Sequence, residues 1–442
     1  MAMFLGHSAA FAQVAGGPPD AQAVPAVLAL EDAIARSLEH NLTILGLTYA
    51  VGEQRGQQRI ARSRLLPDLT GEFSGLEQRL NLSAMGIEIP LPGFDNTVGP
   101  FGVLDWRARL SQTVYSASNL RNHRATGEAV RASELSLDDA RDLITLTVGR
   151  TYFEALAARA RVEATRAQVE TATAIHERAV QQQDAGLATP LDVNRAYAQT
   201  LTSQHRLATL EADFAKQKID LLRLTGLRPT DAYDLEQRVQ FSPEPRVSLD
   251  QAVNDAMQRR SDLQAAEARV RAAELTLSAA RGERTPSVDL AADYGASLAI
   301  GKPLTNTYRI SGMLRVPLWD NGRIGGQVEQ SLSALSRRRL ERDDLRAQIE
   351  ADVRKGYVDL RAAEIGVKVA ELNVQVARET LGLTRQRFEA GVSDNVAVVQ
   401  SQQSLAATEF DQINSVLVHQ LAILELARST GQAAESVSRS QP

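Results

Sequence analysis

The sequence predicts a mainly α-helical protein with a smaller β portion, built from two copies of one unit. Three observations predict this fold class. Only 5% of the 442 residues are aromatic, while Ala, Leu, Arg, Glu and Gln are abundant; these side chains favour helices because they lose little rotamer freedom there. The chain also repeats itself at long range. Finally, four short segments alternate apolar with polar residues, which is the period of a β-strand.

The repeat begins near the N-terminus. "LALEDAIARSLEHN" from Leu28 recurs as "VSLDQAVNDAMQRR" from Val247 at an offset of 219 residues, and a second offset of 205 pairs Tyr152 with Tyr357. We therefore assign repeat 1 to 28–227, a linker with three prolines to 228–246 and repeat 2 to 247–432.

The two ends of the chain lie outside the repeats. Residues 1–27 hold a short apolar stretch and Ala10-Phe11-Ala12, a pattern typical of secretory cleavage sites. We interpret this segment as the remnant of a signal, with a disordered polar tail as the alternative. Residues 433–442 are expected to form a disordered tail.

Each repeat has the same predicted order of elements. A helix ends at a proline, two alternating segments follow, and then come a very long helix, a glycine turn and a further helix. The first helices are expected over 31–66 and 250–285, and the long ones over about 118–185 and 321–390. At 1.5 Å per residue the long helices reach roughly 100 Å. This length is typical of coiled coils or helical tubes.

The alternating segments predict strands over about 67–80, 102–116, 286–299 and 307–320. One face of each strand is apolar, and the other carries charges of both signs, such as Glu72, Arg107 and Asp289. Lipid on one side and water on the other is the pattern of a transmembrane barrel; the alternative is a soluble sheet with one buried face. The predicted membrane-facing side chains are Leu69, Phe73, Trp106, Leu110, Val288, Leu290, Ile310 and Leu314.

Four strands cannot close a barrel by themselves. Open sheet edges are excluded from lipid, so other chains must complete the sheet. Two chains would give eight strands with a filled lumen, whereas three would give twelve strands with room for an aqueous bore.

No catalytic, cofactor-binding or metal site is expected. The net charge of −5 argues against a nucleic-acid partner. The chain has no cysteine, its six histidines are scattered, and no phosphate-binding glycine motif is present. We therefore predict a protein that is not an enzyme.

The order of the elements resembles that of the TolC-like outer membrane factors of Gram-negative efflux pumps and type I secretion systems, over about 28–432. The most specific segments are "AGLATPLDV" (185–193), "FEAGVSDNVAVVQ" (388–400) and "VPLWDNGR" (316–323). The resemblance implies a homotrimer with a 12-stranded outer membrane barrel and a long helical periplasmic tunnel. It also implies a passive export duct, without a cofactor, that a periplasmic adaptor protein and an inner membrane transporter open.

The resemblance places the adaptor against the two hairpin tips, near 186–192 and 391–395. The expected contacts are Gly186, Leu187, Thr189, Asp192, Gly391, Val392, Ser393 and Asp394. The alternative is that the two glycines only end helices as C-caps. The family narrows its pore with acidic residues after the second turn, where this chain has Ala397 and Gln400. Asp394 and Gln400 are therefore the candidates for a pore constriction.

A second hypothesis belongs to a different class of protein. Long helices with few aromatic residues also suit a structural coiled-coil or adhesin-like protein without a pore. The charged face of the predicted strands favours the duct, because that face requires water.

Overall fold

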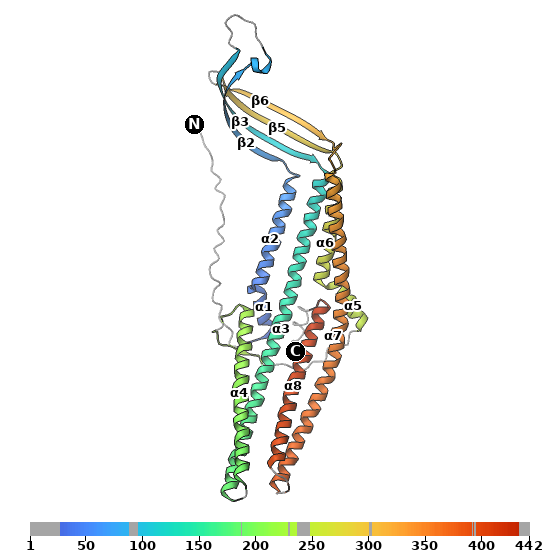
Figure 1. Cartoon of the computed structure of the whole chain (residues 1–442). Helices are drawn as coiled ribbons and strands as arrows, with labels where there is room; N and C mark the ends of the chain where they lie inside the picture. Colours follow the sequence, from blue (N-terminus) through green and yellow to red (C-terminus); the bar gives the residue numbers. More distant parts are fainter. Residues whose placement is uncertain are drawn as a thin grey trace. The chain divides into compact units, whose positions relative to one another are not determined.

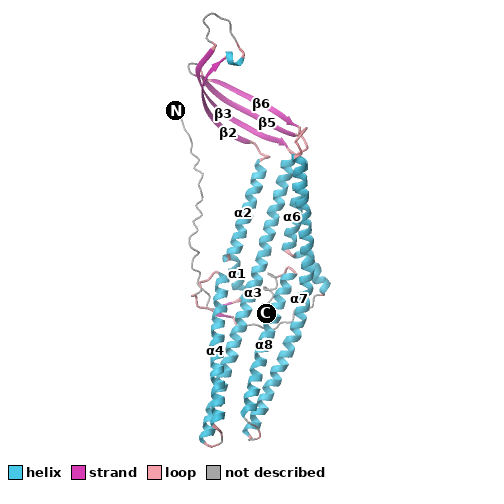
Figure 2. Ribbon diagram, viewed as in Figure 1, coloured by secondary structure: helices cyan, strands magenta, loops and turns pink. Residues whose placement is uncertain are grey.

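The computed structural model describes residues 27–87, 96–186, 188–228, 230–236, 248–299, 303–390, 392 and 395–432. These residues are mainly helical, with one four-stranded antiparallel sheet and one two-stranded parallel pair (Figures 1 and 2). The elements in chain order are β1 (Val27–Leu28), α1 (Leu30–His40), α2 (Leu42–Ser63), β2 (Asp68–Asn81), the 3-10 turn Ser83–Met85, β3 (Thr97–Tyr115), α3 (Ala117–Asp184), α4 (Pro190–Thr225), β4 (Asp234–Leu235), α5 (Leu249–Arg259), α6 (Ser261–Gly282), β5 (Ser287–Ala299), β6 (Thr305–Arg315), α7 (Arg323–Glu389) and α8 (Asn395–Ser429).

The chain divides into two compact units. The first comprises Met1–Ser37, Val148–Ser242 and Val369–Leu417, and the second comprises Leu38–Thr147, Pro243–Lys368 and Val418–Pro442. The long helices α3 and α7 contribute residues to both units.

In the second unit, α2, α3, α6 and α7 lie side by side in that order (Figure 1). Each neighbouring pair shares an apolar cluster or an ion pair: Ile44 and Val51 with Leu137 for α2 and α3, Arg271 with Glu128 for α3 and α6, and Val270 and Leu277 with Leu335 for α6 and α7. Helices α2 and α7 are therefore the two edges of this layer.

The sheet also belongs to the second unit, and its strand order is β2-β3-β5-β6. All neighbouring strands are antiparallel. The strand order matches the helix order because α2 leads into β2, β3 into α3, α6 into β5 and β6 into α7. Strands β2 and β6 are consequently the edges of the sheet.

The first unit contains two helical hairpins, α3 with α4 and α7 with α8. Within it, Arg206 of α4 lies over the ring of Phe410 of α8 at 4.2 Å, and Gln403 donates a hydrogen bond to Gln199 at 3.0 Å. The two hairpins therefore contact each other through α4 and α8.

The structure corrects the two predicted first helices, which are each broken. Asn41 separates α1 from α2, and its side chain accepts a hydrogen bond from the backbone N–H of Thr43 at 2.9 Å. Arg260 separates α5 from α6 with an extended backbone, at φ −62° and ψ 120°. An asparagine cap competes with helix continuation, whereas the break at Arg260 carries no comparable signal in the sequence.

The strands also differ from their predicted ranges at two ends. Strand β3 begins earlier, at Thr97, and β6 ends earlier, at Arg315 rather than near 320. Pro317 has no N–H for a strand ladder. Asp320 then accepts hydrogen bonds from the backbone N–H groups of Gly322 and Ile324, which turns the chain into α7. Trp319 is exposed in this loop and is not part of a strand.

Candidate functional site

One face of the four-stranded sheet is apolar and exposed. The register places Leu69 opposite Leu110, Phe73 opposite Trp106 and Val288 opposite Leu314 on this face. Leu69, Phe73 and Ile310 are 70%, 73% and 72% exposed. Of the other predicted membrane-facing residues, Trp106, Leu290 and Leu314 are exposed, and Leu110 and Val288 are half-buried. An apolar face this open is typical of a surface that meets lipid or another protein.

The opposite face carries a network of charged side chains centred on Arg107 of β3. Its guanidinium lies 2.5 Å from a carboxylate oxygen of Asp105 and 2.7 Å from one of Asp293. It also donates a hydrogen bond to the hydroxyl of Thr307 at 3.1 Å. Arg107 therefore joins three strands, β3, β5 and β6.

Gly295 of β5 makes room for this network. It pairs with Arg107 in the sheet register. A Cβ atom at this position would lie 2.5 Å from Cγ of Arg107 and 2.5 Å from the carbonyl oxygen of Trp106. The missing side chain thus allows Arg107 to lie across the sheet toward Asp293 and Thr307.

The two edge strands are unpaired on their outer sides within the described part of the chain. At the β2 edge, Arg109 donates to Glu72 at 2.8 Å. At the β6 edge, Arg309 lies 4.0 Å from Asp293 with a side chain that is 77% exposed. Unpaired edges present free backbone N–H and C=O groups that another strand can bind.

The first hairpin tip is shaped by a left-handed glycine and a capping box. Gly186 has φ 76°, and its N–H donates to the carbonyl of Gln183. The carboxylate of Asp192 accepts from the backbone N–H of Thr189 at 3.1 Å and from its hydroxyl at 2.7 Å, and these hydrogen bonds lower the pKa of Asp192. Thr189 and Asp192 therefore cap α4 together. The exposed apolar side chain beside them is Leu191, which the sequence analysis did not single out.

The second hairpin tip is described only in part. The N–H of Val392 donates to the carbonyl of Arg387 at 2.9 Å, and the Val392 side chain is exposed. Gln400 of α8 is also exposed. The predicted contacts Leu187, Gly391, Ser393 and Asp394 lie outside the described residues.

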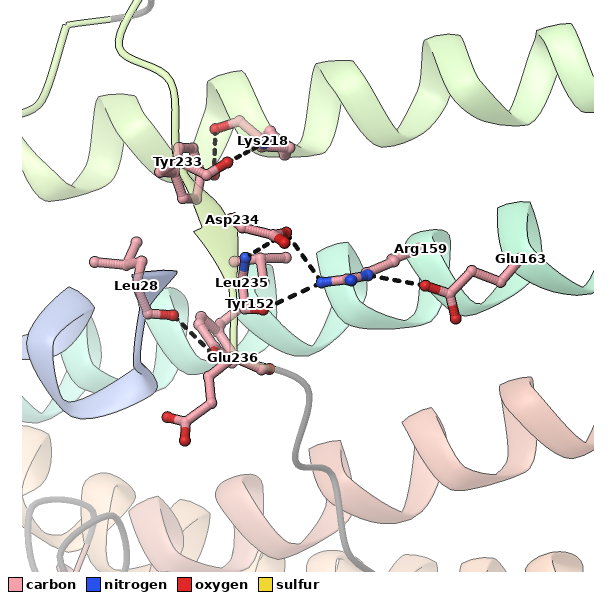
Figure 3. A network of polar contacts seen from close by, with 9 residues as sticks. All are labelled: Leu28, Tyr152, Arg159, Glu163, Lys218, Tyr233, Asp234, Leu235 and Glu236. Carbon is pink, nitrogen blue, oxygen red and sulfur yellow. Dashed lines mark hydrogen bonds and ion pairs between the residues drawn. The ribbon is translucent and has the colours of Figure 1, made fainter. Parts of the chain in front are cut away.

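A polar clasp holds the start of the inter-repeat linker in the first unit (Figure 3). Strands β1 and β4 pair in parallel through Leu28 and Leu235. The hydroxyl of Tyr152 on α3 donates to the carbonyl of Leu28 at 3.1 Å, and Arg159 donates to the carboxylate of Asp234 at 3.0 Å. Burial raises the pKa of Tyr152, so its hydroxyl stays a donor.

The second side of this clasp is formed by α4. Tyr233 donates through its hydroxyl to the carbonyl of Lys218 at 2.9 Å, and the ammonium of Lys218 donates back to the carbonyl of Tyr233. The same ammonium lies 4.6 Å from the centre of the Tyr233 ring. Sequence reasoning assigned the linker no structure, because two-residue strands have no period to detect.

A group of partly buried charges lies in the second unit. Arg428, near the end of α8, donates to the carboxylate of Asp139 on α3. Burial is the main cause that raises the pKa of both Asp139 and Asp142. Burial also acts on Asp262, but hydrogen bonds and the charge of Arg260 outweigh it, so the pKa of Asp262 is lowered.

Two kinds of site were searched for in the residues that the structure describes. Among them, no group of three or more histidine, cysteine, aspartate or glutamate side chains is arranged to hold a metal ion. No helix among the described residues is both long enough and apolar enough to cross a membrane.

Comparisons with known proteins agree with this geometry. The profile of the family described as outer membrane efflux protein matches residues 33–227 and 252–432. Outer membrane protein OprJ of Pseudomonas aeruginosa is 25% identical over 422 residues, which cover 89% of this chain and 82% of OprJ. The pyoverdine export outer membrane protein OpmQ of Pseudomonas putida is 22% identical, over 90% of this chain and 84% of OpmQ. The crystal structure of the outer membrane protein VceC from Vibrio cholerae shares the fold, with a TM-score of 0.79 and 19% identity over 91% of this chain and 96% of VceC.

Proposed function

Because the chain belongs to the outer membrane efflux protein family, we propose that three copies assemble into one export duct. The chain is the outer membrane channel component of an efflux system. In the proposed trimer, three four-stranded sheets close a barrel of twelve strands, and the helical layers join into a periplasmic tunnel. The duct is passive, and a periplasmic adaptor and an inner membrane transporter engage and open it.

The observation that carries this proposal is the sheet. It has an exposed apolar face, an ionic face and two unpaired edges. A bilayer tolerates an apolar strand face but not a free edge. A closed ring of sheets satisfies both conditions, because it turns the ionic face toward water and leaves no edge.

The outer side of α7 supports assembly with other copies. Its exposed apolar residues recur at spacings of three, four and seven, which is the pattern of a coiled-coil seam. They are Leu340, Val358 and Ile365 in the second unit, and Val369, Leu372, Val376 and Leu383 in the first. No described residue of this chain covers them, so a neighbouring copy is the proposed partner.

The other edge of the helical layer, α2, offers a matching surface. Leu42, Leu45 and Tyr49 are exposed on it. Gly52 and Gly56 continue this side of the helix, and a Cβ atom at either position meets no described atom within 4 Å. The absence of side chains there permits a close approach by the α7 helix of the next copy.

The hairpin tips are the proposed contacts of the adaptor. Leu191 and Val392 present exposed apolar side chains there. Thr189 and Asp192 support the first tip as a helix cap, so their contribution to adaptor binding is the shape of the turn. Asp394 and Gln400 stay the candidates for the pore constriction.

Reconstitution tests the proposal. Purified in detergent, the chain is expected to run at three times its 48.0 kDa mass and to conduct ions in planar bilayers. A monomeric rod that is soluble without detergent and passes no current would refute the duct and favour the structural coiled-coil hypothesis.

A further inference from the structure

The charges on the ionic face of the sheet are sorted by strand. Over Asp68–Ser74, the charged residues that β2 places on this face are Asp68 and Glu72. Over Thr305–Arg315, the charged residues that β6 places on it are Arg309 and Arg315. One edge of the sheet is therefore acidic and the other basic.

The basic edge is only weakly neutralised within its own chain. Arg309 lies 4.0 Å from Asp293, whose carboxylate already binds Arg107 at 2.7 Å. Arg315 lies 4.0 Å from Asp289 with a side chain that is 68% exposed. By contrast, the side chain of Arg107 in the middle of the sheet is 24% exposed.

The acidic edge is incompletely neutralised as well. Glu72 binds Arg109, but its side chain stays 51% exposed. Asp68 is exposed and forms no ion pair with any described residue. Both edges therefore keep capacity for partners beyond the sheet of one chain.

The order of signs indicates which partner fits. From β2 to β6 the ladder runs acid, base, acid, base through Glu72, Arg109, Asp293 and Arg309. An acidic strand continues the ladder, and β2 of a second copy is such a strand. Pairing two β2 edges or two β6 edges would instead place like charges opposite each other, which destabilises a strand pair.

We propose that the acidic edge β2 of one copy pairs with the basic edge β6 of the next, so that Asp68 and Glu72 face Arg309 and Arg315. This inference rests on the proposed trimer and adds the contact that orders it. The pairing is head-to-tail, and such contacts form a ring when the rotation closes. The match holds for every register that keeps the two faces, because each edge carries charges of one sign.

Cross-linking tests the partner of each edge. The chain has no cysteine, so introduced thiols are unique. Thr70→Cys with Ser311→Cys, and Ser74→Cys with Thr307→Cys, place one thiol on each edge. A bifunctional maleimide long enough to span several residues is expected to link both double variants into covalent dimers and trimers. The four single variants are expected to stay unlinked; linked single variants, or unlinked double variants in an intact trimer, would overturn the inference.

Charge substitution tests the electrostatic part. Arg309→Gln with Arg315→Gln removes the basic edge, and Arg309→Lys with Arg315→Lys is the matched control that keeps it. The glutamine variant is expected to lower the temperature at which the trimer dissociates in detergent and to make it less sensitive to salt, since salt screens exposed charges. The lysine variant is expected to behave like the wild type.

The outcomes separate this inference from the proposed function. A wild-type chain that is monomeric and passes no current contradicts the proposed duct itself. A conducting wild-type trimer whose glutamine variant dissociates at the wild-type temperature at low salt contradicts only the charge-matched edges.

Discussion

Three aspartates in the second unit show how differently burial acts on single side chains. Asp139, Asp142 and Asp262 face Arg428 and Arg260, and Asp138 also acts on Asp142. Burial disfavours the charged form of each carboxylate. Arg260 reverses this effect at Asp262 through hydrogen bonds of 3.0 and 2.6 Å, whereas Asp142 keeps a raised pKa.

Asp142→Asn is expected to raise the Tm at pH 7. A pKa raised by folding means that the folded chain binds more protons than the unfolded one, so charged Asp142 lowers stability as the pH rises. The gain in Tm is expected to vanish below about pH 4, where the unfolded carboxyl is also neutral. Thermal unfolding followed by circular dichroism across this pH range measures it.

Asp262→Asn is the matched control with the opposite sign. The lowered pKa of Asp262 stabilises the fold above the ordinary pKa of an aspartate, and this stability is lost as the pH falls. The substitution is therefore expected to lower the Tm at pH 7. Equal effects of the two substitutions would contradict the assignment of burial to one and pairing to the other.

Among the elements, the strap formed by β1 and β4 depends most on contacts with its neighbours. Each strand has only two residues, and a strand pair this short is not stable by itself. Tyr152 and Arg159 of α3 supply hydrogen bonds from one side, and Lys218 of α4 supplies one from the other. The clasp thus ties both helices of the first hairpin to the linker between the repeats.

Tyr152→Phe is expected to loosen this strap. The substitution removes one hydrogen bond to the carbonyl of Leu28, a loss of about 1 kcal/mol. Local opening then becomes about fivefold more frequent. Hydrogen exchange of the Glu236 amide, which donates to the same carbonyl at 3.2 Å, measures the change. Tyr49→Phe, at an exposed position of α2, is the control; unchanged exchange in Tyr152→Phe would show that the backbone alone holds the strap.

For the whole molecule, the central feature is that its free surfaces come in complementary pairs. The sheet ends in an acidic and a basic edge, and the layer of helices ends in α2 and α7. Since the two edges of each layer differ, the copies join head-to-tail rather than face-to-face. The monomer is therefore a segment of a ring.

Val358→Glu with Ile365→Glu is expected to abolish the trimer and to leave the helical content unchanged. The two side chains are 65% and 63% exposed, so the isolated chain does not depend on them. Burying each at a junction stabilises assembly by about 1.5–3 kcal/mol. Light scattering after size exclusion measures the mass. Val358→Ile with Ile365→Val keeps the apolar surface and is expected to stay trimeric; a trimeric glutamate variant would place the interface elsewhere.

Local patterns in the sequence predicted much of the fold. Alternation placed Leu69 and Phe73 on one strand face and Glu72 on the other, and the register agrees. The glycine in "DAGLATP" lies at a tight turn with a left-handed backbone. These features follow from neighbouring residues alone, because side-chain direction and turn geometry repeat over two to five positions.

The sequence by itself determined the two-fold order of helices and strands, and which residues share a face. Only the tertiary structure decided which strands are edges, that Arg107 lies over Gly295, and that Tyr152 holds the linker. These contacts join residues that are 84 to 200 positions apart, as in Tyr152 with Glu236 and Arg107 with Thr307. No local period encodes such pairings, since they depend on strand order and register, which are set by how the whole chain packs.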